Sequence, residues 1–243
     1  MAASTEVKIF AKPKKVAQRV AKQIFKMTQR SSQPHFNIAL SGGSTPKKLF
    51  KILVEKHKDS IPWERLHFWW GDERCVSPDH EESNFKMTND ILFSQIDIPQ
   101  ENIHRIKGEN APEEEATRYS EEIAENLNSR NGIPVFDLII LGMGDDGHTA
   151  SIFPNQLNLL EEEQVCAVAE HPETGQQRIT LTGKVINNAN RIFFLVTGEN
   201  KAQRIAEIMN DEEVAKLLPA YYITPENGKL IWYIDEAASS KIA

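Results

Sequence analysis

This chain of 243 residues has only two cysteines, no long apolar run and no excess of positive charge. Its two cysteines, Cys75 and Cys166, lie far apart and form no C-x-x-C pattern, which argues against a disulfide framework or a zinc ribbon. The longest apolar run, which starts at Phe136, is too short to cross a bilayer. The first ten residues lack the apolar core of a secretory signal. We therefore expect a cytoplasmic protein with no membrane partner.

The charge balance is acidic, with 28 Lys and Arg against 35 Asp and Glu and a formal net charge of −7. Such a chain is poorly suited to coating nucleic acid, so we expect no nucleic-acid partner, although a local basic pocket stays possible in principle. Apolar residues make up 40% and charged residues 26%, which is typical of a globular protein. At this length we expect a single domain over residues 1–243.

Apolar runs of strand length alternate with segments of helical periodicity. The predicted strands span residues 36–40, 66–70, 136–141 and 192–196, and the predicted helices span 46–56, 84–94, 113–127 and 200–210. A half-buried strand over 178–182, a strand over 230–234 and a closing helix over 235–242 complete the pattern. This alternation predicts an α/β fold, a mostly parallel sheet with helices on both faces. Ligands of such sheets bind beyond the carboxyl ends of the strands, so the loops that follow strands are the candidate sites.

Residues 12–30 form one further helical pattern. Val16, Val20 and Ile24 mark an apolar face, and lysines and arginines mark the opposite face. A basic amphipathic helix can bind membranes or nucleic acid. The simpler interpretation, which we favour here, is a packed surface helix with a solvated basic face.

The first candidate site is Ser41-Gly-Gly-Ser-Thr-Pro46, between a predicted strand and a predicted helix. Gly42 and Gly43 allow the backbone to approach a ligand closely, and Ser44 and Thr45 add hydroxyl groups. With Pro46 at the first helical position, Thr45 would be the N-cap. Free N–H groups at a helix start favour a phosphate, whereas the structural alternative is a well-capped glycine-rich turn.

The second candidate is the loop Gly71-Asp-Glu-Arg-Cys-Val-Ser-Pro-Asp-His80. Arg74 offers a planar guanidinium suited to phosphate or carboxylate. Asp72 and Glu73 are candidates for acid–base groups, for metal ligands or for simple ion-pair partners of Arg74. The spacing of Asp72 and His80 matches no recognised metal motif, so we expect no metal.

The third candidate is Leu141-Gly-Met-Gly-Asp-Asp-Gly-His-Thr-Ala-Ser-Ile-Phe-Pro154, again directly after a predicted buried strand. His148 is suited to act as a general base near neutral pH, although a lone histidine is often structural. Asp146 is close enough in sequence to orient the imidazole. The amides of residues 142–147 are expected to be available to an oxyanion.

Two cations are weaker candidates. Lys201 lies at a predicted helix start, where a positive charge is unfavourable unless an anion compensates it. Arg178 is the first residue of the strand over 178–182. Either could instead belong to a surface ion pair.

Taken together, these loops resemble those of the 6-phosphogluconolactonase family. The matching segments are residues 41–46, 71–74 with 79–80 and 83–84, 146–154, 178–182 and 197–201. Their order and spacing extend from about Phe36 to Arg204. One departure is Gly183-Lys184, where the family usually has a proline, which leaves the local loop geometry open.

The resemblance implies a Rossmann-like sheet and the metal-independent hydrolysis of 6-phosphoglucono-δ-lactone to 6-phosphogluconate in the oxidative pentose phosphate pathway, with no cofactor. His148 would activate water with help from Asp146. Asp72 and the cations would bind substrate along with the Gly42–Thr45 loop; the cations are Arg74, Arg178 and Lys201. The partner would be a sugar-phosphate lactone, and the protein a monomer or weak homodimer.

Two alternatives are weighed against this prediction. Glucosamine-6-phosphate deaminases are similar, but they typically carry Asp-Glu-Tyr where this chain has Asp72-Glu73-Arg74, and Asn-Glu-Pro where it has Ile152-Phe153-Pro154. The ring-opening carboxylate of that family is therefore missing. A sugar-phosphate sensor would carry an added DNA-binding segment, and the sheet pattern here already begins near Val7.

Overall fold

A six-stranded parallel sheet forms the centre of the structure, a computed structural model that describes residues 4–242. Its strands are β1 (Ser4–Phe10), β2 (Phe36–Leu40), β3 (Leu66–Trp70), β7 (Leu138–Leu141), β10 (Arg191–Val196) and β11 (Lys229–Asp235). They lie in the order β1-β11-β10-β7-β2-β3, with every neighbouring pair parallel. The prediction of a mostly parallel sheet is confirmed.

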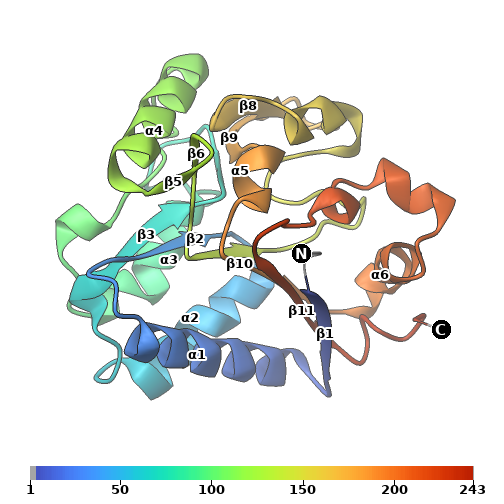
Figure 1. Cartoon of the computed structure of the whole chain (residues 1–243), viewed down its shortest axis with the longest axis horizontal. Helices are drawn as coiled ribbons and strands as arrows, with labels where there is room; N and C mark the ends of the chain where they lie inside the picture. Colours follow the sequence, from blue (N-terminus) through green and yellow to red (C-terminus); the bar gives the residue numbers. More distant parts are fainter. Residues whose placement is uncertain (1–3, 243) are drawn as a thin grey trace.

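Helices cover both faces of this sheet (Figure 1). They are α1 (Pro13–Arg30), α2 (Ser44–His57), α3 (Asn84–Ile91), α4 (Pro112–Asn126), α5 (Gly183–Asn187) and α6 (Ala202–Met209). Because successive side chains of a strand point to opposite faces, Trp69 packs against Tyr119 of α4 while Trp70 packs against Phe85 of α3. Coverage on both sides explains why the strands read as continuous apolar runs.

Short elements connect this framework. A three-stranded antiparallel sheet has the order β4 (Asp72–Arg74), β9 (Gln177–Leu181), β8 (Cys166–Glu170), and β5 (Ser129–Arg130) pairs with β6 (Ile133–Pro134). Short 3-10 helices span Trp63–Arg65, Phe93–Gln95, Gln100–Asn102, Pro154–Leu160, Glu199–Lys201, Glu213–Leu217 and Pro219–Tyr222. The strand β9 is buried on both faces from Arg178 to Leu181, not half-buried as predicted, because its polar side chains also point inward.

Two local predictions need correction. The helix α2 begins at Ser44 with Gly43 as its N-cap, at φ +110°, so Thr45 is not the cap and Pro46 is the third helical residue. Residues 236–241 form turns in place of the predicted closing helix. There the Asp235 carboxylate accepts the N–H of Ala238 at 2.9 Å, a local bond that competes with helix formation in so short a segment. At the departure from the family pattern, Gly183 starts α5 and lies against the backbone of Leu160, and Lys184, two residues after Thr182, is the second residue of that helix.

The strand order reverses between β2 and β7. From β2 the chain continues to β3 at one edge of the sheet, whereas β7 is followed by β10 and β11 toward the other edge. In open parallel sheets this reversal leaves a crevice at the carboxyl ends of the two strands. The loops that follow β2 and β7 are the first and third candidate sites.

Candidate active site

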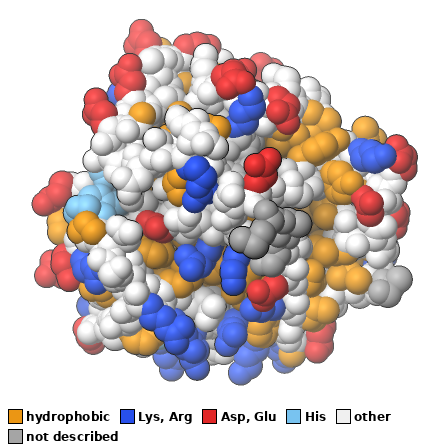
Figure 2. Space-filling model, viewed as in Figure 1, with side chains coloured by type: hydrophobic (Ala, Val, Ile, Leu, Met, Phe, Trp, Pro, Cys, Tyr) orange, Lys and Arg blue, Asp and Glu red, His pale blue; other side chains and the backbone are white. Residues whose placement is uncertain are grey.

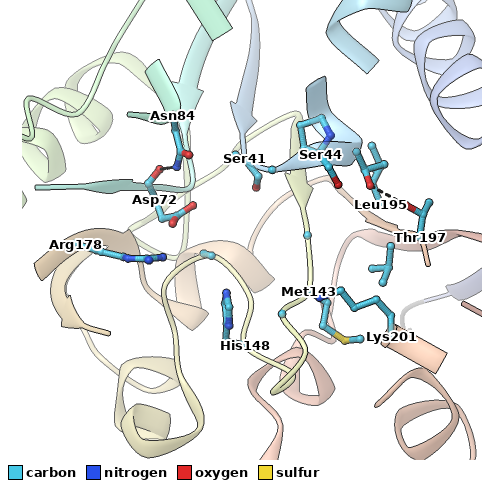
Figure 3. A pocket seen from close by; sticks show the side chains of 18 of the residues that line it. Ser41, Ser44, Asp72, Asn84, Met143, His148, Arg178, Leu195, Thr197 and Lys201 are labelled. Atoms are coloured by element: carbon cyan, nitrogen blue, oxygen red, sulfur yellow. Dashed lines mark hydrogen bonds between the residues drawn. The ribbon is translucent and has the colours of Figure 1, made fainter. Parts of the chain in front are cut away.

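A cavity of about 250 Å³ lies at the carboxyl ends of β2 and β7 (Figure 3). The loops after β2, β3, β7 and β10 line it together with β9. The site residues that the family resemblance implies all line this cavity except Asp146, which accepts a hydrogen bond from His148. Those that line it are Gly42, Gly43, Ser44, Thr45, Asp72, Arg74, His148, Arg178 and Lys201. The structure thus brings all three predicted loops together.

His148 is held by the carboxylate of Asp146. Because a carboxylate only accepts, Nδ1 of His148 donates to Oδ1 of Asp146, at 2.6 Å, and the backbone N–H of His148 donates to the same oxygen at 3.1 Å. Burial raises the pKa of Asp146, but the hydrogen bond and charge of His148 outweigh it and lower that pKa to about 2. An ionised Asp146 keeps the proton on Nδ1. The lone pair of Nε2 is then available, and Figure 3 shows the ring directed into the cavity.

The loop around His148 depends on its glycines. A Cβ on Gly144 would lie 2.2 Å from Nδ1 of His148. The N–H groups of Gly144 and Gly147 donate to the carbonyls of His148 and Gly144, so they are not available to an oxyanion, contrary to the prediction for the whole segment 142–147. Within residues 4–242, the amides of Gly142 and Met143 have no such partner, and both residues line the cavity.

The two acids after β3 have different surroundings. Oδ2 of Asp72 accepts a 2.7 Å hydrogen bond from Oγ of Ser151 and lies at the cavity, away from His148. Glu73 instead accepts the backbone N–H groups of Arg74, Asn84 and Phe85. Burial raises the pKa of Glu73. Glu73 thus caps the start of α3, and Asp72 is the acid that faces the cavity.

The start of α2 supplies neutral donors. The first N–H groups of a helix have no partner within it, and those of Ser44 and Thr45 lie in the first turn. The Thr45 hydroxyl lies 2.9 Å from that of Thr197, and the Ser41 hydroxyl donates to the carbonyl of Ile140. The Ser44 hydroxyl and the first-turn amides are left to bind an anion.

Arg178 is the most deeply buried cation of the cavity, at 9% exposure. Its Nε has no hydrogen-bond partner, and it forms no ion pair with any residue from 4 to 242. Burial lowers the pKa of Arg178, and the charge of Asp72 opposes this shift. A guanidinium in this state has unused capacity for an anionic ligand.

The other two cations already have partners. Nη1 of Arg74 donates to the carbonyl of Glu82, although its buried Nε is unpartnered. Nζ of Lys201 pairs with the Asp145 carboxylate. The negative charge expected near Lys201 is therefore supplied at least in part by the chain itself.

Two lining or supporting residues, Asn84 and Phe153, were not singled out from the sequence. Asn84 lies against Gly42, where a Cβ would come within 1.9 Å of its Oδ1. Phe153 lies between His148 and Arg178: its ring centroid is 4.8 Å from that of His148 and 5.5 Å from Cζ of Arg178. Asn84 and Phe153 both lie inside the segments that carry the family resemblance, which is the one signal that could have identified them.

No group of three or more His, Cys, Asp and Glu side chains suited to a metal ion occurs in residues 4–242. Over the same residues no helix is long and apolar enough to cross a membrane.

Several known proteins are similar to this chain in sequence and in fold. The family model described as glucosamine-6-phosphate isomerases/6-phosphogluconolactonase matches residues 11–232. A 6-phosphogluconolactonase of Haemophilus influenzae is 48% identical over 221 residues, which are 90% of this chain and 92% of that protein. The solved structure of the devB protein has 45% identity and a TM-score of 0.94, covering 99% of this chain and 100% of that one. The structure of 6-phosphogluconolactonase from Leishmania guyanensis has 27% identity and a TM-score of 0.88, covering 99% of each. This chain belongs to the family of glucosamine-6-phosphate isomerases and 6-phosphogluconolactonases, as its loops indicated.

Proposed function

We propose that this chain is a 6-phosphogluconolactonase, which hydrolyses 6-phosphoglucono-δ-lactone to 6-phosphogluconate. The observation that carries the proposal is one cavity in which His148, held by Asp146, lies near a buried arginine without an anionic partner, Arg178. Hydrolysis of a phosphorylated ester requires a base that activates water and a cation that binds the phosphate. The 48% identical relative bears the same activity in its name.

In the proposed reaction, Nε2 of His148 takes a proton from water as the water oxygen attacks the lactone carbonyl carbon. The carbonyl oxygen becomes an oxyanion, and the amides of Gly142 and Met143 are the donors available to it. When the tetrahedral intermediate collapses, the bond between the carbonyl carbon and the ring oxygen breaks. The imidazolium of His148 then protonates the departing alkoxide, which restores the neutral base.

Asp146 stabilises the imidazolium during this cycle. Its pKa of about 2 keeps it ionised throughout the neutral range, so it does not itself carry the transferred proton. Lactones also hydrolyse without a catalyst, so the catalytic demand is modest and one well-placed base is sufficient.

The phosphate of the substrate is proposed to bind the start of α2 and the cations of the cavity. The amides of the Gly42–Thr45 loop and the Ser44 hydroxyl would donate to the phosphate oxygens. Arg178 would form a charge-assisted pair, with Lys201 and Arg74 in supporting positions. Asp72 would accept hydrogen bonds from sugar hydroxyls, since its carboxylate lies at the cavity and away from the base.

Several predictions about the context of this activity accompany the proposal. They are the oxidative pentose phosphate pathway, a cytoplasmic location, a single domain over residues 1–243, a monomer or weak homodimer, and the absence of a cofactor or a nucleic-acid partner. One continuous cluster of buried apolar residues, from Val16 to Ala238, supports the single domain.

A continuous assay tests the proposal. The lactone is generated in place, and the purified chain is compared with buffer alone at the same pH. We expect hydrolysis well above the spontaneous rate and no ammonia from glucosamine 6-phosphate. A rate equal to that of buffer would refute the proposal, and release of ammonia would favour the deaminase alternative.

A further inference from the structure

A second cavity, of about 550 Å³, lies at the opposite end of the sheet from the first. It is bounded by the second half of α1 and by the amino ends of β10 and β11, with Phe36 and Asp137 at its far side. Its volume is within the range of small-molecule sites. No step of the proposed reaction uses it.

Positive charge dominates this second cavity. Two carboxylates, those of Glu6 and Asp137, face five cations, which leaves an excess of three positive charges in a chain whose net charge is −7. The cations are Lys8, Lys26, Arg30, Arg191 and Lys229. Figure 2 shows lysine and arginine side chains gathered along the lower part of the molecule, where α1 lies in Figure 1.

Most of these cations lack a partner. Lys8 pairs with Glu6 at 2.7 Å. Across residues 4–242, no ion pair or side-chain hydrogen bond involves Lys26, Arg30, Arg191 or Lys229. The two carboxylates offset only part of this charge, so the excess cations repel one another and a bound anion would reduce that repulsion.

The cavity also has an apolar side, and the ring of Tyr233, which does not itself line the cavity, packs against the lining residue Phe193. Met27, Phe193 and Ile231 contribute apolar surface to its lining. On β11, two residues beyond Ile231, the Tyr233 hydroxyl is fully buried without a hydrogen-bond partner in the described chain. Burial raises the pKa of Tyr233 to about 12, and the charge of Arg19 opposes this shift. This neutral hydroxyl is a donor without an acceptor.

We propose that this cavity binds a small organic polyphosphate with an apolar moiety, the chemistry of a nucleoside di- or triphosphate. Two or more phosphates match the three excess positive charges, and the apolar surface accommodates the rest of the ligand. The site is separate from the lactone site and does not depend on the proposed function.

A membrane surface or a nucleic acid is less compatible with the same charges. Either would also contact the exposed residues of α1 outside the cavity, such as Lys14 and Lys15. A cavity with apolar walls instead selects a compact ligand. A ligand in the cavity and a contact spread over the surface therefore predict different effects of substitutions on α1.

The experiment is isothermal titration calorimetry with ADP, ATP and inorganic pyrophosphate at physiological salt. We expect ADP and ATP to bind the full chain more tightly than pyrophosphate does. Lys26→Glu should weaken ADP binding about tenfold or more, and Arg191→Gln, on a different element, should act in the same direction. Lys14→Glu, with the same charge change on the same helix, should stay within about twofold.

Three outcomes would overturn the proposal: no binding of either nucleotide at millimolar concentration, equal losses in Lys26→Glu and Lys14→Glu, or pyrophosphate binding as tightly as ADP. Equal losses would indicate a diffuse surface interaction of the kind that nucleic acid makes. Lactone hydrolysis without nucleotide, measured alongside, should be unchanged in all three variants, which verifies that they are folded.

Discussion

The hydroxyl of Ser151 donates a 2.7 Å hydrogen bond to Oδ2 of Asp72, and both residues are buried. The two residues are 79 positions apart in the chain. Their hydrogen bond therefore connects the loop that carries His148 to the segment that follows β3. Figure 3 shows Asp72 on the same side of the cavity as Arg178, with His148 apart from it. The two acids thus have separate positions, with Asp146 bonded to the proposed base and Asp72 close to the charge of Arg178.

Gly144→Ala should inactivate the site without unfolding the chain. The new Cβ would lie 2.2 Å from Nδ1 of His148 and 2.5 Å from Oδ1 of Asp146, so the imidazole must move. Misplacement of a catalytic group by about 1 Å costs on the order of 100-fold in rate. The matched control is Gly142→Ala in the same loop, whose Cβ meets no atom within 4 Å. Equal activity of the two variants in the lactone assay would refute the proposed placement of His148.

Arg178→Gln should discriminate between a phosphorylated and an unphosphorylated substrate. If Arg178 holds the phosphate, kcat/KM for 6-phosphoglucono-δ-lactone should fall about 10- to 100-fold, since a charge-assisted pair contributes roughly 1.5–3 kcal/mol. Hydrolysis of glucono-δ-lactone, which lacks the phosphate, should change little. Lys201→Gln should show the same pattern with a smaller loss, because Lys201 already pairs with Asp145. Equal losses on both substrates would remove Arg178 from the phosphate site.

Asp146→Asn should change how stability depends on pH. The pKa of Asp146 in the folded chain is about 2, below its ordinary value of 3.8, so its ionised form stabilises the fold. That contribution is fully present above about pH 4 and is lost as the pH falls through 2. Because the Asp146 side chain is 42% exposed, we expect less than about 1 kcal/mol at pH 7. In urea denaturation, the difference in unfolding free energy between wild type and Asp146→Asn should shrink as the pH falls from 4 to 2. A difference that does not depend on pH would contradict the lowered pKa of Asp146.

Glu73→Gln should destabilise the fold without acting on chemistry. The variant places an amide NH₂ where one carboxylate oxygen accepts a backbone N–H of α3, and an unsatisfied buried donor costs about 1–3 kcal/mol. Burial raises the pKa of Glu73. The protonated form therefore adds to the free energy of unfolding at low pH, and this contribution is lost as the pH rises through the raised pKa. The glutamine variant should lack this dependence. Denaturation midpoints are compared with those of Glu81→Gln, an exposed neighbour that should behave as wild type.

The local sequence pattern was sufficient to predict the central strands, but it did not predict the partners that individual side chains contact in the fold. The apolar runs at residues 36–40 and 66–70 became β2 and β3 with the predicted bounds, because burial on both faces leaves a continuous apolar signal. The cap that Glu73 places on α3 joins residues 11 positions apart or more, and no periodicity reveals it. The burial of Arg178 likewise depends on β4, which pairs with its strand from about 100 residues earlier in the chain, as well as on the neighbouring strand β8.

The ends of helices were the least predictable elements. Thr45 has the side chain of an N-cap, yet its hydroxyl contacts Thr197, a residue 152 positions away, and Gly43 takes the cap position with a positive φ. The segment after Asp235 has helix-forming residues but forms turns. At Thr45 a tertiary partner outweighs local propensity, and after Asp235 a local side-chain hydrogen bond does.

The proposed role of His148 is tested most directly by the pH profile of kcat/KM for 6-phosphoglucono-δ-lactone, measured for wild type and His148→Gln. Glutamine keeps a polar side chain of similar size but cannot accept a proton from water. We predict that the variant loses about 100-fold or more in kcat/KM and also loses the rise of activity with pH that an ionising base produces. A folded His148→Gln variant with the wild-type rate and the wild-type pH profile would contradict the assignment of His148 as the base.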